Sequence, residues 1–387
     1  MITEILLYLF LLVIAYTYIG YPVLLLILAR LFPSDVNKVG YIDSLSVIIS
    51  AHNEGEVIYR RLLDLYSQDY PRDQVEVILI SDGSVDNTIA EVERFIADYP
   101  DFQIKLIEFE INQGKPAALN KAVSVAAGNI LLFTDSRQEF EANVFAELVS
   151  NFSDPAVGCV SGELFFRQSA KSKIKKQMGL YWNYEKAIRK MESKLSSVVG
   201  VTGAIYALRR ELYEPIPNNT LTDDLLIPLK VSLQGRRVIF DGDAVAYDTV
   251  SDDEKQEWRR KIRTLTGNWQ LLFDHLYLFN PFRNKILLQL ISHKVLRLVV
   301  PFCMIGVFVS SLVLANEGYL GFFMLQVFFY LLMTLVYFLP KLKQSKSLNF
   351  AYFFVLLNVA VMVSLLRILF SDNALDWGNA HKEKKDG

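Results

Sequence analysis

The sequence predicts an α/β protein with a mostly parallel β-sheet, flanked by one N-terminal and about three C-terminal transmembrane helices. Short apolar runs alternate with helical patterns through the middle of the chain, which is typical of a sheet covered by helices on both faces. Long uncharged runs lie near both ends of the chain, and aspartates directly follow two of the short apolar runs. Because ligands of such sheets bind beyond the carboxyl ends of the strands, these aspartates indicate a ligand site.

The composition argues against several classes of protein. Hydrophobic residues make up 52% of the 387 residues, and the net charge of -2 argues against a nucleic-acid partner. The two cysteines, Cys159 and Cys303, lie far apart, and the four histidines show no metal-binding spacing. The sequence therefore predicts neither a disulfide framework nor a zinc site.

The first element is an apolar run, Ile5–Ala29, which carries no charge. It exceeds the roughly 20 apolar residues that a helix needs to cross a bilayer. No cluster of basic residues precedes it and no cleavage site follows, so we interpret it as an anchor and not as a signal peptide. A buried helix of a soluble protein is the alternative. The "IGYP" segment within the run predicts a kink.

Three more uncharged runs of near-spanning length follow the central domain: Leu298–Asn316, Gly318–Pro340 and Ser347–Leu366. If all four runs cross, the basic residues beside them fall on one side of the membrane: Arg30, Lys294, Arg297, Lys341, Lys343 and Lys346. Such residues are enriched in cytoplasmic loops, so we expect a multi-pass inner (plasma) membrane protein whose central domain lies in the cytoplasm. The tail "HKEKKDG" would then face outward, whereas a re-entrant last helix would return it to the cytoplasm.

The central region divides into predicted strands and helices. The predicted strands are Leu45–Ser50, Val75–Ser81, Ile104–Phe109, Ile130–Thr134 and Val157–Glu163, with a further strand in "GAIYALRR". The predicted helices are Glu54–Ser67, Asn87–Tyr99, Lys115–Ala127, Val144–Phe152 and Lys171–Lys194. Glu254–Leu276 is basic, aromatic and helical, and it suits either the membrane interface or an ordinary protein surface. The predicted divisions of the chain are residues 1–32, 33–250, 251–296, 297–371 and 372–387.

Three aspartates are the leading candidates for chemistry. Asp82 in "ISDGSVDNT" and Asp135 in "LLFTDSRQEF" each follow an apolar strand, and Asp224 lies in "TDDLLIPLKV" at a helix start. Strand-end carboxylates can hold a ribose, a base or a divalent ion bound to phosphate oxygens. Each signal is weak alone, because Asp-Gly turns and acidic N-caps are common without any ligand.

Basic residues supply a second set of candidates. Lys115 in "INQGKPAALNKAV" is placed at a helix N-terminus, an end that favours negative charge. A bound diphosphate would resolve the conflict, and a solvated lysine is the alternative. In "QEWRRKIRTLTGNWQ", Arg259, Arg260 and Arg263 lie between Trp258 and Trp269. These arginines suit either phosphates or anionic lipid headgroups.

In this order and spacing, the motifs resemble the membrane-bound family-2 glycosyltransferases, which have a GT-A (Rossmann-like) fold. The resemblance runs from "SVIISAHNE" through "SHKVLRLVVPF", which is nearly the whole chain. It implies that Asp82 contacts the uridine of the donor, that Asp135 binds Mg²⁺ or Mn²⁺, and that Asp224 is the catalytic base.

The chain departs from the family pattern at several positions. Ser81 stands where the family has a second acid before Asp82, and Arg137 replaces the second acid of the Asp-x-Asp element, so Asp135 alone would bind the metal. Of the Gln-x-x-Arg-Trp element only Arg263 is kept, since Arg260 replaces the glutamine and Thr264 the tryptophan. The missing tryptophan argues against processive polymerisation.

The resemblance also implies further contacts. The donor-binding residues would be His52, Asn53, Glu54, Asp82, Lys115, Asp135, Arg260 and Arg263. The acceptor-binding residues would be Gly203, Asp223 and Trp269.

The function implied is an inverting transfer from a nucleotide-diphosphate sugar, foremost a UDP-sugar, to a lipid-linked or glycan acceptor at the membrane. Two alternatives remain within reach of the motifs: a processive polysaccharide synthase, and a non-catalytic membrane scaffold with a degenerate transferase domain. A dinucleotide-binding oxidoreductase would suit the sheet pattern, but the chain has no G-x-G-x-x-G element.

Overall fold

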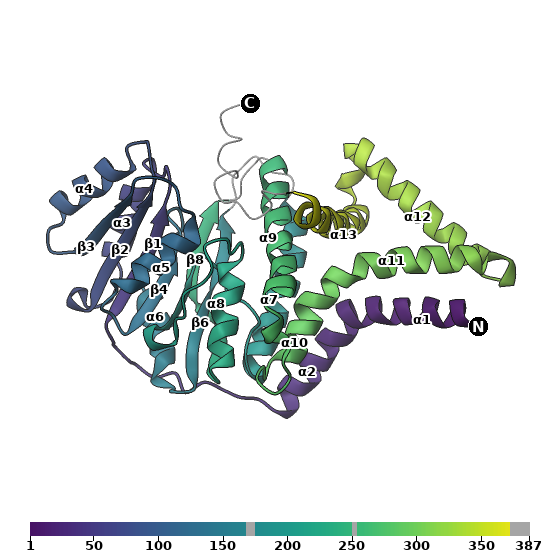
Figure 1. Ribbon diagram of the computed structural model, residues 1–387, viewed down its shortest axis with the longest axis horizontal. Helices are drawn as coiled ribbons and strands as arrows, with labels where there is room; N and C mark the ends of the chain where they lie inside the picture. The colour runs from purple at the N-terminus through teal and green to yellow at the C-terminus, as the bar shows by residue number, and fades with distance from the viewer. Residues whose placement is uncertain (168–174, 250–253, 372–387) are drawn as a thin grey trace.

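A computed structural model of the chain describes residues 1–167, 175–249 and 254–371. The molecule is elongated, with an α/β domain at one end and a group of long apolar helices at the other (Figure 1). Two helices of the domain side, α7 (Lys175–Leu195) and α9 (Glu254–Asp274), lie between the sheet and the apolar helices. The sheet and the membrane-type helices are therefore joined through a layer of amphipathic helices.

One eight-stranded sheet forms the centre of the domain, in the order β3-β2-β1-β4-β7-β6-β8-β5. Strands β1, β2, β3 and β4 pair in parallel, as do β6 and β8, whereas β7 and β5 are antiparallel to their neighbours. The bounds are β1 Leu45–Ala51, β2 Val75–Asp82, β3 Gln103–Phe109, β4 Ile130–Thr134, β5 Glu139–Phe140, β6 Val157–Arg167, β7 Tyr206–Arg209 and β8 Arg237–Thr249.

The predicted strands are all present, and the mostly parallel sheet is confirmed. The sequence did not predict β5 or β8. Strand β8 carries acids and a glycine in "RVIFDGDAVAYDT", which hide its apolar periodicity, and β5 has only 2 residues. Tertiary pairing with β6 and β8 forms these strands in spite of their weak local preference.

Helices cover both faces of the sheet, so its central strands are buried on both sides and consist of continuous apolar runs. Alternate residues of β1 divide between the two faces: Val47 and Ile49 pack with α3, α4 and α6, while Ile48 packs with α5 and α8. The covering helices are α3 Ile58–Tyr66, α4 Thr88–Asp98, α5 Lys115–Ser124, α6 Val144–Ser150 and α8 Asp223–Leu233. Short 3₁₀ turns complete the domain and its linkers: η2 Arg72–Gln74, η3 Asn151–Ser153, η4 Arg210–Leu212, η5 Leu276–Phe279, η7 Ala315–Glu317 and η8 Pro340–Gln344.

Four helical stretches are long and apolar enough to cross a membrane by length and composition: Ile2–Leu31, Leu287–Val313, Leu320–Phe338 and Lys346–Phe370. The first consists of α1 (Ile2–Ala15) and α2 (Tyr21–Leu31), joined by the π-helical η1 (Tyr16–Gly20). The second consists of α10 (Leu287–Gln289), the π-helical η6 (Leu290–Val295) and α11 (Leu296–Val313). The third and fourth are α12 (Leu320–Phe338) and α13 (Lys346–Phe370).

The first stretch bends between α1 and α2 (Figure 1), where the sequence predicts a kink. Pro22 has no N–H to donate to Tyr18, four residues earlier. The Tyr18 carbonyl instead accepts a hydrogen bond of 3.0 Å from the Tyr184 hydroxyl of α7. The kink therefore also fixes the apolar helix to the domain.

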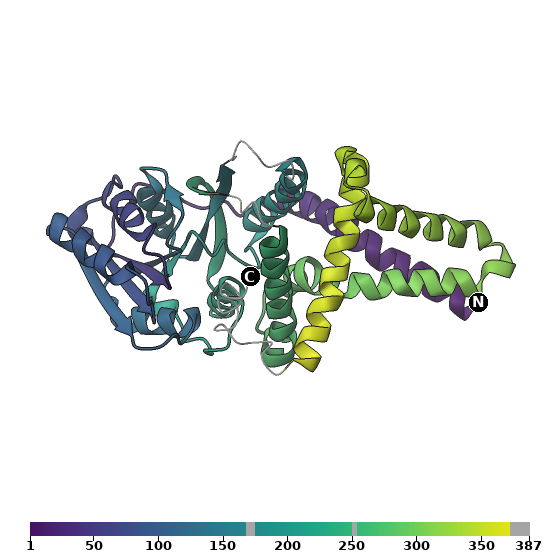
Figure 2. The ribbon, with the colours of Figure 1, turned by 90° about the horizontal axis from the view of Figure 1, so that it is seen from above.

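Helix α13 has a different direction from the other long apolar helices. Helices α1 and α11 run alongside each other and α12 returns from the outer end of α11 at an angle, whereas α13 runs across them and beside α9 (Figures 1 and 2). Val361 of α13 packs with Trp269 of α9 and Leu298 of α11 in one buried cluster. This direction suits a helix that lies along the membrane surface.

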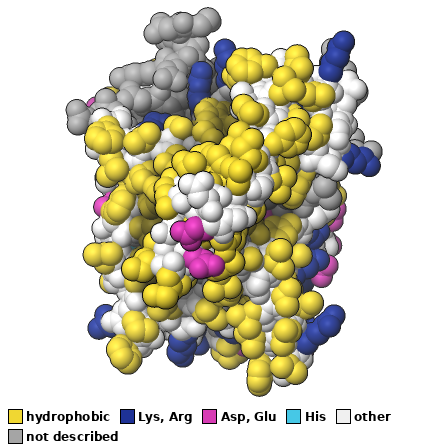
Figure 3. All heavy atoms as spheres, turned by 90° about the vertical axis from the view of Figure 1, so that its right-hand side faces the viewer, with side chains coloured by type: hydrophobic (Ala, Val, Ile, Leu, Met, Phe, Trp, Pro, Cys, Tyr) yellow, Lys and Arg dark blue, Asp and Glu magenta, His cyan; other side chains and the backbone are white. Residues whose placement is uncertain are grey.

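The outer end of the apolar group exposes mainly hydrophobic side chains, with Lys and Arg largely at the edge of the view (Figure 3). Phe328 and Leu331 of α12 are more than half exposed. An exposed apolar surface of this extent is typical of a membrane-embedded region. At this end Tyr319 bonds to both Tyr8 and Glu4, so the N-terminus lies beside the turn between α11 and α12.

We predict that Ser371, at the end of α13, lies on the same side of the membrane as the domain, and that Asn316, between α11 and α12, lies on the opposite side. Both positions are exposed, and the two native cysteines are buried, so Ser371→Cys and Asn316→Cys can be labelled selectively. An impermeant maleimide should label Ser371→Cys from the side that labels an exposed domain position, Lys121→Cys, and Asn316→Cys from the other. Labelling of Ser371→Cys and Asn316→Cys from one side would show that α13 crosses. The residues of the predicted "HKEKKDG" tail lie outside the described part of the chain.

Candidate active site

The carboxyl ends of β1, β2 and β4 meet at one edge of the sheet, because the three strands are parallel neighbours. The chain runs from β1 to β2 and β3 on one side of β1, and then returns to β4 on the other side. The strand order therefore reverses at β1, which makes this edge a topological switch point. Ligands of open α/β sheets bind at such points. The loops after the three strands carry most of the candidate residues.

Asp82 is buried at the end of β2 and its carboxylate is engaged by backbone. Its two oxygens accept hydrogen bonds of 2.7 Å from the Gln113 N–H and 2.9 Å from the Gly114 N–H. Gly114 has a φ of 89°, which favours glycine, and it directly precedes α5. Asp82 therefore fixes the start of α5, and with it Lys115.

The loop after β1 is fixed to the loop after β2. A His52 ring nitrogen lies 2.7 Å from the Asp82 carbonyl oxygen, and the Asn53 side-chain oxygen accepts a bond of 2.8 Å from the Val85 N–H. Asn53 has a φ of 55°, an unusual conformation for a residue other than glycine. The Glu54 N–H donates to the Thr88 hydroxyl. These three predicted donor-binding residues thus lie on one rim of the switch point.

Lys115 links two separate parts of the site. Its ammonium lies 2.9 Å from Asp135 Oδ1 and 3.6 Å from Asp223 Oδ2. Burial alone would lower the pKa of Lys115, but the nearby Asp135 and Asp223 carboxylates raise it above its usual value. Burial would likewise raise the pKa of Asp135, but Lys115, with Arg137 and Arg263, holds it below its usual range. Asp135 is therefore ionised and Lys115 is protonated.

Asp223 and Asp224 form the first turn of α8, where acidic residues are favoured by the helix dipole. Burial, followed by the charge of Asp223, raises the pKa of Asp224 to about 6, although Lys115 opposes the rise. A Cβ on Gly203 would lie 3.3 Å from Asp224 Cβ, a tight contact, and 3.5 Å from Asp224 Oδ2, an ordinary one, so the backbone at Gly203 passes close to the Asp224 side chain. A carboxylate with a pKa close to neutrality is suited to accept a proton.

Helix α9 packs closely against the loop that carries the two acids. A Cβ on Gly267 would lie 2.5 Å from a Thr222 side-chain carbon, and the Gln270 side chain accepts a bond of 3.1 Å from the Leu221 N–H. This contact holds Arg263 where its charge acts on Asp135. Trp269, a predicted acceptor contact, instead lies between α9 and α13 and donates its indole N–H to the Val361 carbonyl.

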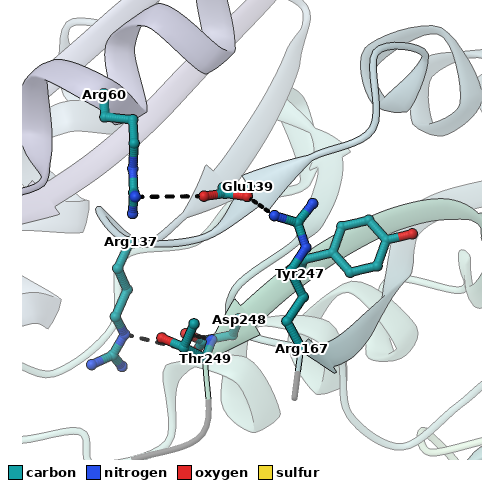
Figure 4. Close-up of a pocket in the computed structure, with 7 residues that line it drawn as sticks. All are labelled: Arg60, Arg137, Glu139, Arg167, Tyr247, Asp248 and Thr249. Atoms are coloured by element: carbon teal, nitrogen blue, oxygen red, sulfur yellow. Dashed lines mark hydrogen bonds and ion pairs between the residues drawn. The ribbon is translucent and has the colours of Figure 1, made fainter. Parts of the chain in front are cut away.

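A pocket that includes Arg137, two residues after Asp135, is lined by Arg60, Arg137, Glu139, Arg167, Tyr247, Asp248 and Thr249 (Figure 4). Arg60 and Arg167 both pair with Glu139, and Arg137 lies 3.8 Å from Asp248. The charges of Arg137 and Asp248 also act on Arg260 of α9. Burial, followed by the positive charge of Arg137, lowers the pKa of the Arg260 guanidinium. Arginines exceed acids here, so the wall beside Asp135 is suited to anions.

A divalent ion is the cofactor that the sequence implies. The described residues contain no cluster of three or more His, Cys, Asp or Glu that could hold a metal ion. Asp135 is nevertheless ionised and its side chain is 33% exposed. One carboxylate suits Mg²⁺ or Mn²⁺ if phosphate oxygens complete the coordination, so the residues fit a metal that binds together with a diphosphate.

One residue that supports the site was not predicted. Arg61 of α3 is buried and donates 2.7 Å to the Thr134 hydroxyl and 2.9 Å to the Gln138 carbonyl. It also pairs with Asp64, and the Thr134 hydroxyl bonds on to the Ala204 carbonyl of the neighbouring segment. Arg61 thus fixes the residues on either side of Asp135. In the sequence it appears as one arginine of an amphipathic helix, with nothing to distinguish it from Arg60.

Residues 46–216 match the family model "Glycosyl transferase family 2". The curated relatives include poly-beta-1,6-N-acetyl-D-glucosamine synthases of two species. The Staphylococcus epidermidis protein is 22% identical over 235 residues, 60% of this chain and 56% of the relative. The Staphylococcus aureus protein is 23% identical over 247 residues, 63% of this chain and 58% of the relative. The chain thus spans less than two thirds of these relatives.

A solved structure has the same fold over almost the whole chain. The mannosyltransferase PcManGT from Pyrobaculum calidifontis, in complex with GDP-Man and Mn²⁺, has a TM-score of 0.71 at 22% identity, with 95% of this chain and 99% of that chain covered. The predicted GT-A-like fold with flanking apolar helices is therefore confirmed.

We predict that Arg61→Met lowers the free energy of unfolding by about 3–5 kcal/mol, because it leaves Asp64 and several acceptors buried without their cation. The adjacent Arg60→Met is the matched control. Arg60 is 65% exposed and its pair with Glu139 is loose, so its loss should cost under about 1 kcal/mol. Denaturant titration of the purified protein followed by tryptophan fluorescence compares the two. Equal stability of both variants would contradict a supporting role for Arg61.

Proposed function

We propose that the protein is an inverting glycosyltransferase of a membrane, because residues 46–216 match the model of glycosyl transferase family 2 and the chain has a GT-A-like fold. The donor is a nucleotide-diphosphate sugar and the acceptor is a lipid-linked or growing glycan. The observation that supports the proposal best is the pairing of an ionised strand-end carboxylate, Asp135, with a near-neutral one, Asp224, across Lys115.

The donor would bind at the switch point with its diphosphate near Asp135. Lys115 lies 2.9 Å from Asp135, the charge of Arg263 acts on Asp135, and Arg260 is close enough to Arg263 for their charges to interact. These three cations would stabilise the diphosphate as it leaves. A divalent ion held by Asp135 would add to this charge stabilisation when bound, as Mn²⁺ in the related mannosyltransferase structure suggests. Asp82 supports the same position through the loop before α5 and remains the proposed uridine contact.

A UDP-sugar is the donor we propose. The names of the relatives make N-acetylglucosamine the first sugar to test, and the GDP-Man complex of the structural neighbour makes GDP-mannose the second donor to test. Donor screening with purified protein in detergent compares them directly.

The chemical step would be a single displacement. The acceptor hydroxyl oxygen attacks the anomeric carbon, the bond to the diphosphate breaks, and the nucleoside diphosphate leaves with the electron pair. Asp224 takes the hydroxyl proton, and its pKa of about 6 allows it to do so near neutral pH. Gly203 leaves room for the acceptor beside Asp224, and Asp223 keeps the basicity of Asp224 high.

We propose that the protein lies in the inner (plasma) membrane with the domain in the cytoplasm. The candidate spans Ile2–Leu31, Leu287–Val313 and Leu320–Phe338, with the basic residues beside them, support this orientation. Nucleotide sugars would then reach the site from the cytoplasm, and the acceptor would reach it from the membrane side.

Polymerisation of the acceptor is the second candidate function, and the names of the sequence relatives favour it. Thr264 at the position of the family's tryptophan favours a single addition or a short extension. Sizing of the products after incubation with donor decides between the two, because a processive enzyme yields long chains while most acceptor is still unused.

We predict that Asp224→Asn lowers sugar transfer by roughly 10²–10⁴-fold, since the amide cannot accept the proton. Donor binding should persist, and UDP with Mn²⁺ should still raise the melting temperature of the variant. The exposed Asp73, at the far end of β2, provides the control Asp73→Asn, which should transfer normally.

Two results would contradict this assignment. Near-normal transfer by Asp224→Asn would exclude Asp224 as the base. Absence of any protection of the wild-type protein by UDP or GDP with Mn²⁺, together with no transfer, would favour the non-catalytic scaffold.

A further inference from the structure

A cluster of charged residues lies where α7 meets the foot of α11. Glu192 of α7 is fully buried, accepts a bond of 2.6 Å from the Tyr21 hydroxyl, and lies 2.9 Å from a His293 ring nitrogen. The other His293 nitrogen lies 3.0 Å from Glu185, which also pairs with Arg297. Both carboxylates therefore have basic partners within the cluster.

Among the described residues, two further cations in the same place form no ion pair with a carboxylate, although the charges of Glu185 and Asp224 act on Lys294 from a greater distance. Arg189 lies on α7 between Glu185 and Glu192, and Lys294 follows His293. Arg189 donates 2.8 Å to the Thr202 hydroxyl, but within the described ranges no carboxylate lies within ion-pair distance of either Arg189 or Lys294. Both side chains are half-buried, and partly burying an unpaired charge costs free energy. The pair thus has the character of a site for an anion.

This pair of cations adjoins the proposed base. Thr202, the partner of Arg189, precedes Gly203, whose Cα faces the Asp224 carboxylate. The charges of Arg189 and Lys294 both act on Asp224. An anion between them would lie beside the acceptor position, on the side of the site that faces the apolar helices.

The location favours one class of anion. Lys294 lies within the candidate span Leu287–Val313, in the π-helical turn from which α11 leaves the domain. At this level the anions that a bilayer supplies are lipid phosphates, and Arg and Lys are the side chains that bind phosphate. The phosphates of the proposed donor have other cations, Lys115, Arg260 and Arg263, in the part of the site around Asp135 and Arg137.

We propose that Arg189 and Lys294 bind the phosphate group of a lipid-linked acceptor and so hold the acceptor's sugar hydroxyl next to Asp224. This proposal rests on the proposed function and narrows its acceptor to a phosphate-bearing lipid. In the transfer, the bond from the acceptor oxygen to the anomeric carbon forms as the bond to the diphosphate breaks. The hydroxyl proton passes to Asp224, and the lipid phosphate stays intact.

The test measures binding of a short polyisoprenyl phosphate, citronellyl phosphate, to the full-length protein in detergent with UDP and Mn²⁺ present. Citronellol, the same chain without phosphate, is the first comparison. The wild-type protein should bind the phosphate at least about tenfold more tightly than the alcohol. Lys294→Met and Arg189→Met should each weaken phosphate binding about tenfold or more, while the exposed Lys285→Met should not.

Two outcomes would overturn the proposal. One is equal affinity of the wild-type protein for citronellyl phosphate and citronellol, a result that does not depend on how the variants fold. The other is equally tight binding of dioctanoyl phosphatidic acid, which would place an ordinary membrane lipid at this site. Protection by UDP and Mn²⁺ is recorded in the same samples. If that protection is present and the phosphate preference is absent, the acceptor assignment fails while the proposed transferase function stands.

Discussion

The site depends on one lysine that pairs with carboxylates from two distant segments. Lys115 starts α5, Asp135 directly follows β4, and Asp223 begins α8, so a single ammonium group joins parts of the chain more than 100 residues apart. Without a cation, three carboxylates in a partly buried place would repel one another and take up protons. With Lys115 present, Asp135 stays ionised while Asp224 keeps a raised pKa, and the two acids acquire different chemical roles. The buried Asp82 contributes by holding the loop that aims Lys115.

The sequence predicted this candidate site in outline because Asp82 and Asp135 lie at the ends of buried strands, and buried strands are easy to recognise. The continuous apolar runs of β1, β2 and β4 reflect helices on both faces of the sheet. Lys115 was noticeable because a lysine is unfavourable at a helix N-terminus, and the structure gives the reason in its two carboxylate partners. Arg61, Arg189 and Lys294 gave no such signal, since their roles depend on contacts between segments far apart in sequence. Strand β8 was missed because pairing, and not local preference, forms it.

The domain and the apolar helices form one structure through α7 and α9. Tyr184 of α7 bonds to the carbonyl freed by Pro22, and Gly267 of α9 lets that helix approach Thr222, next to the two acids of α8. Trp269 on the other side of α9 packs against α13. Helices α7 and α9, which carry Arg189, Arg260 and Arg263, are thus held between the sheet and the apolar helices. The geometry of the site therefore depends on the position of the protein in the bilayer.

The most direct test of this account is the pH dependence of kcat/KM in the wild type and in Lys115→Met, with the exposed Lys121→Met of the same helix as control. Activity should require the ionised Asp224, so wild-type kcat/KM should fall as the pH drops through about 6. Loss of the Lys115 charge destabilises the Asp224 carboxylate and raises its pKa, so the acid limb should move to higher pH in Lys115→Met and stay in place in Lys121→Met. An acid limb at the same pH in all three proteins would contradict the central role given to Lys115.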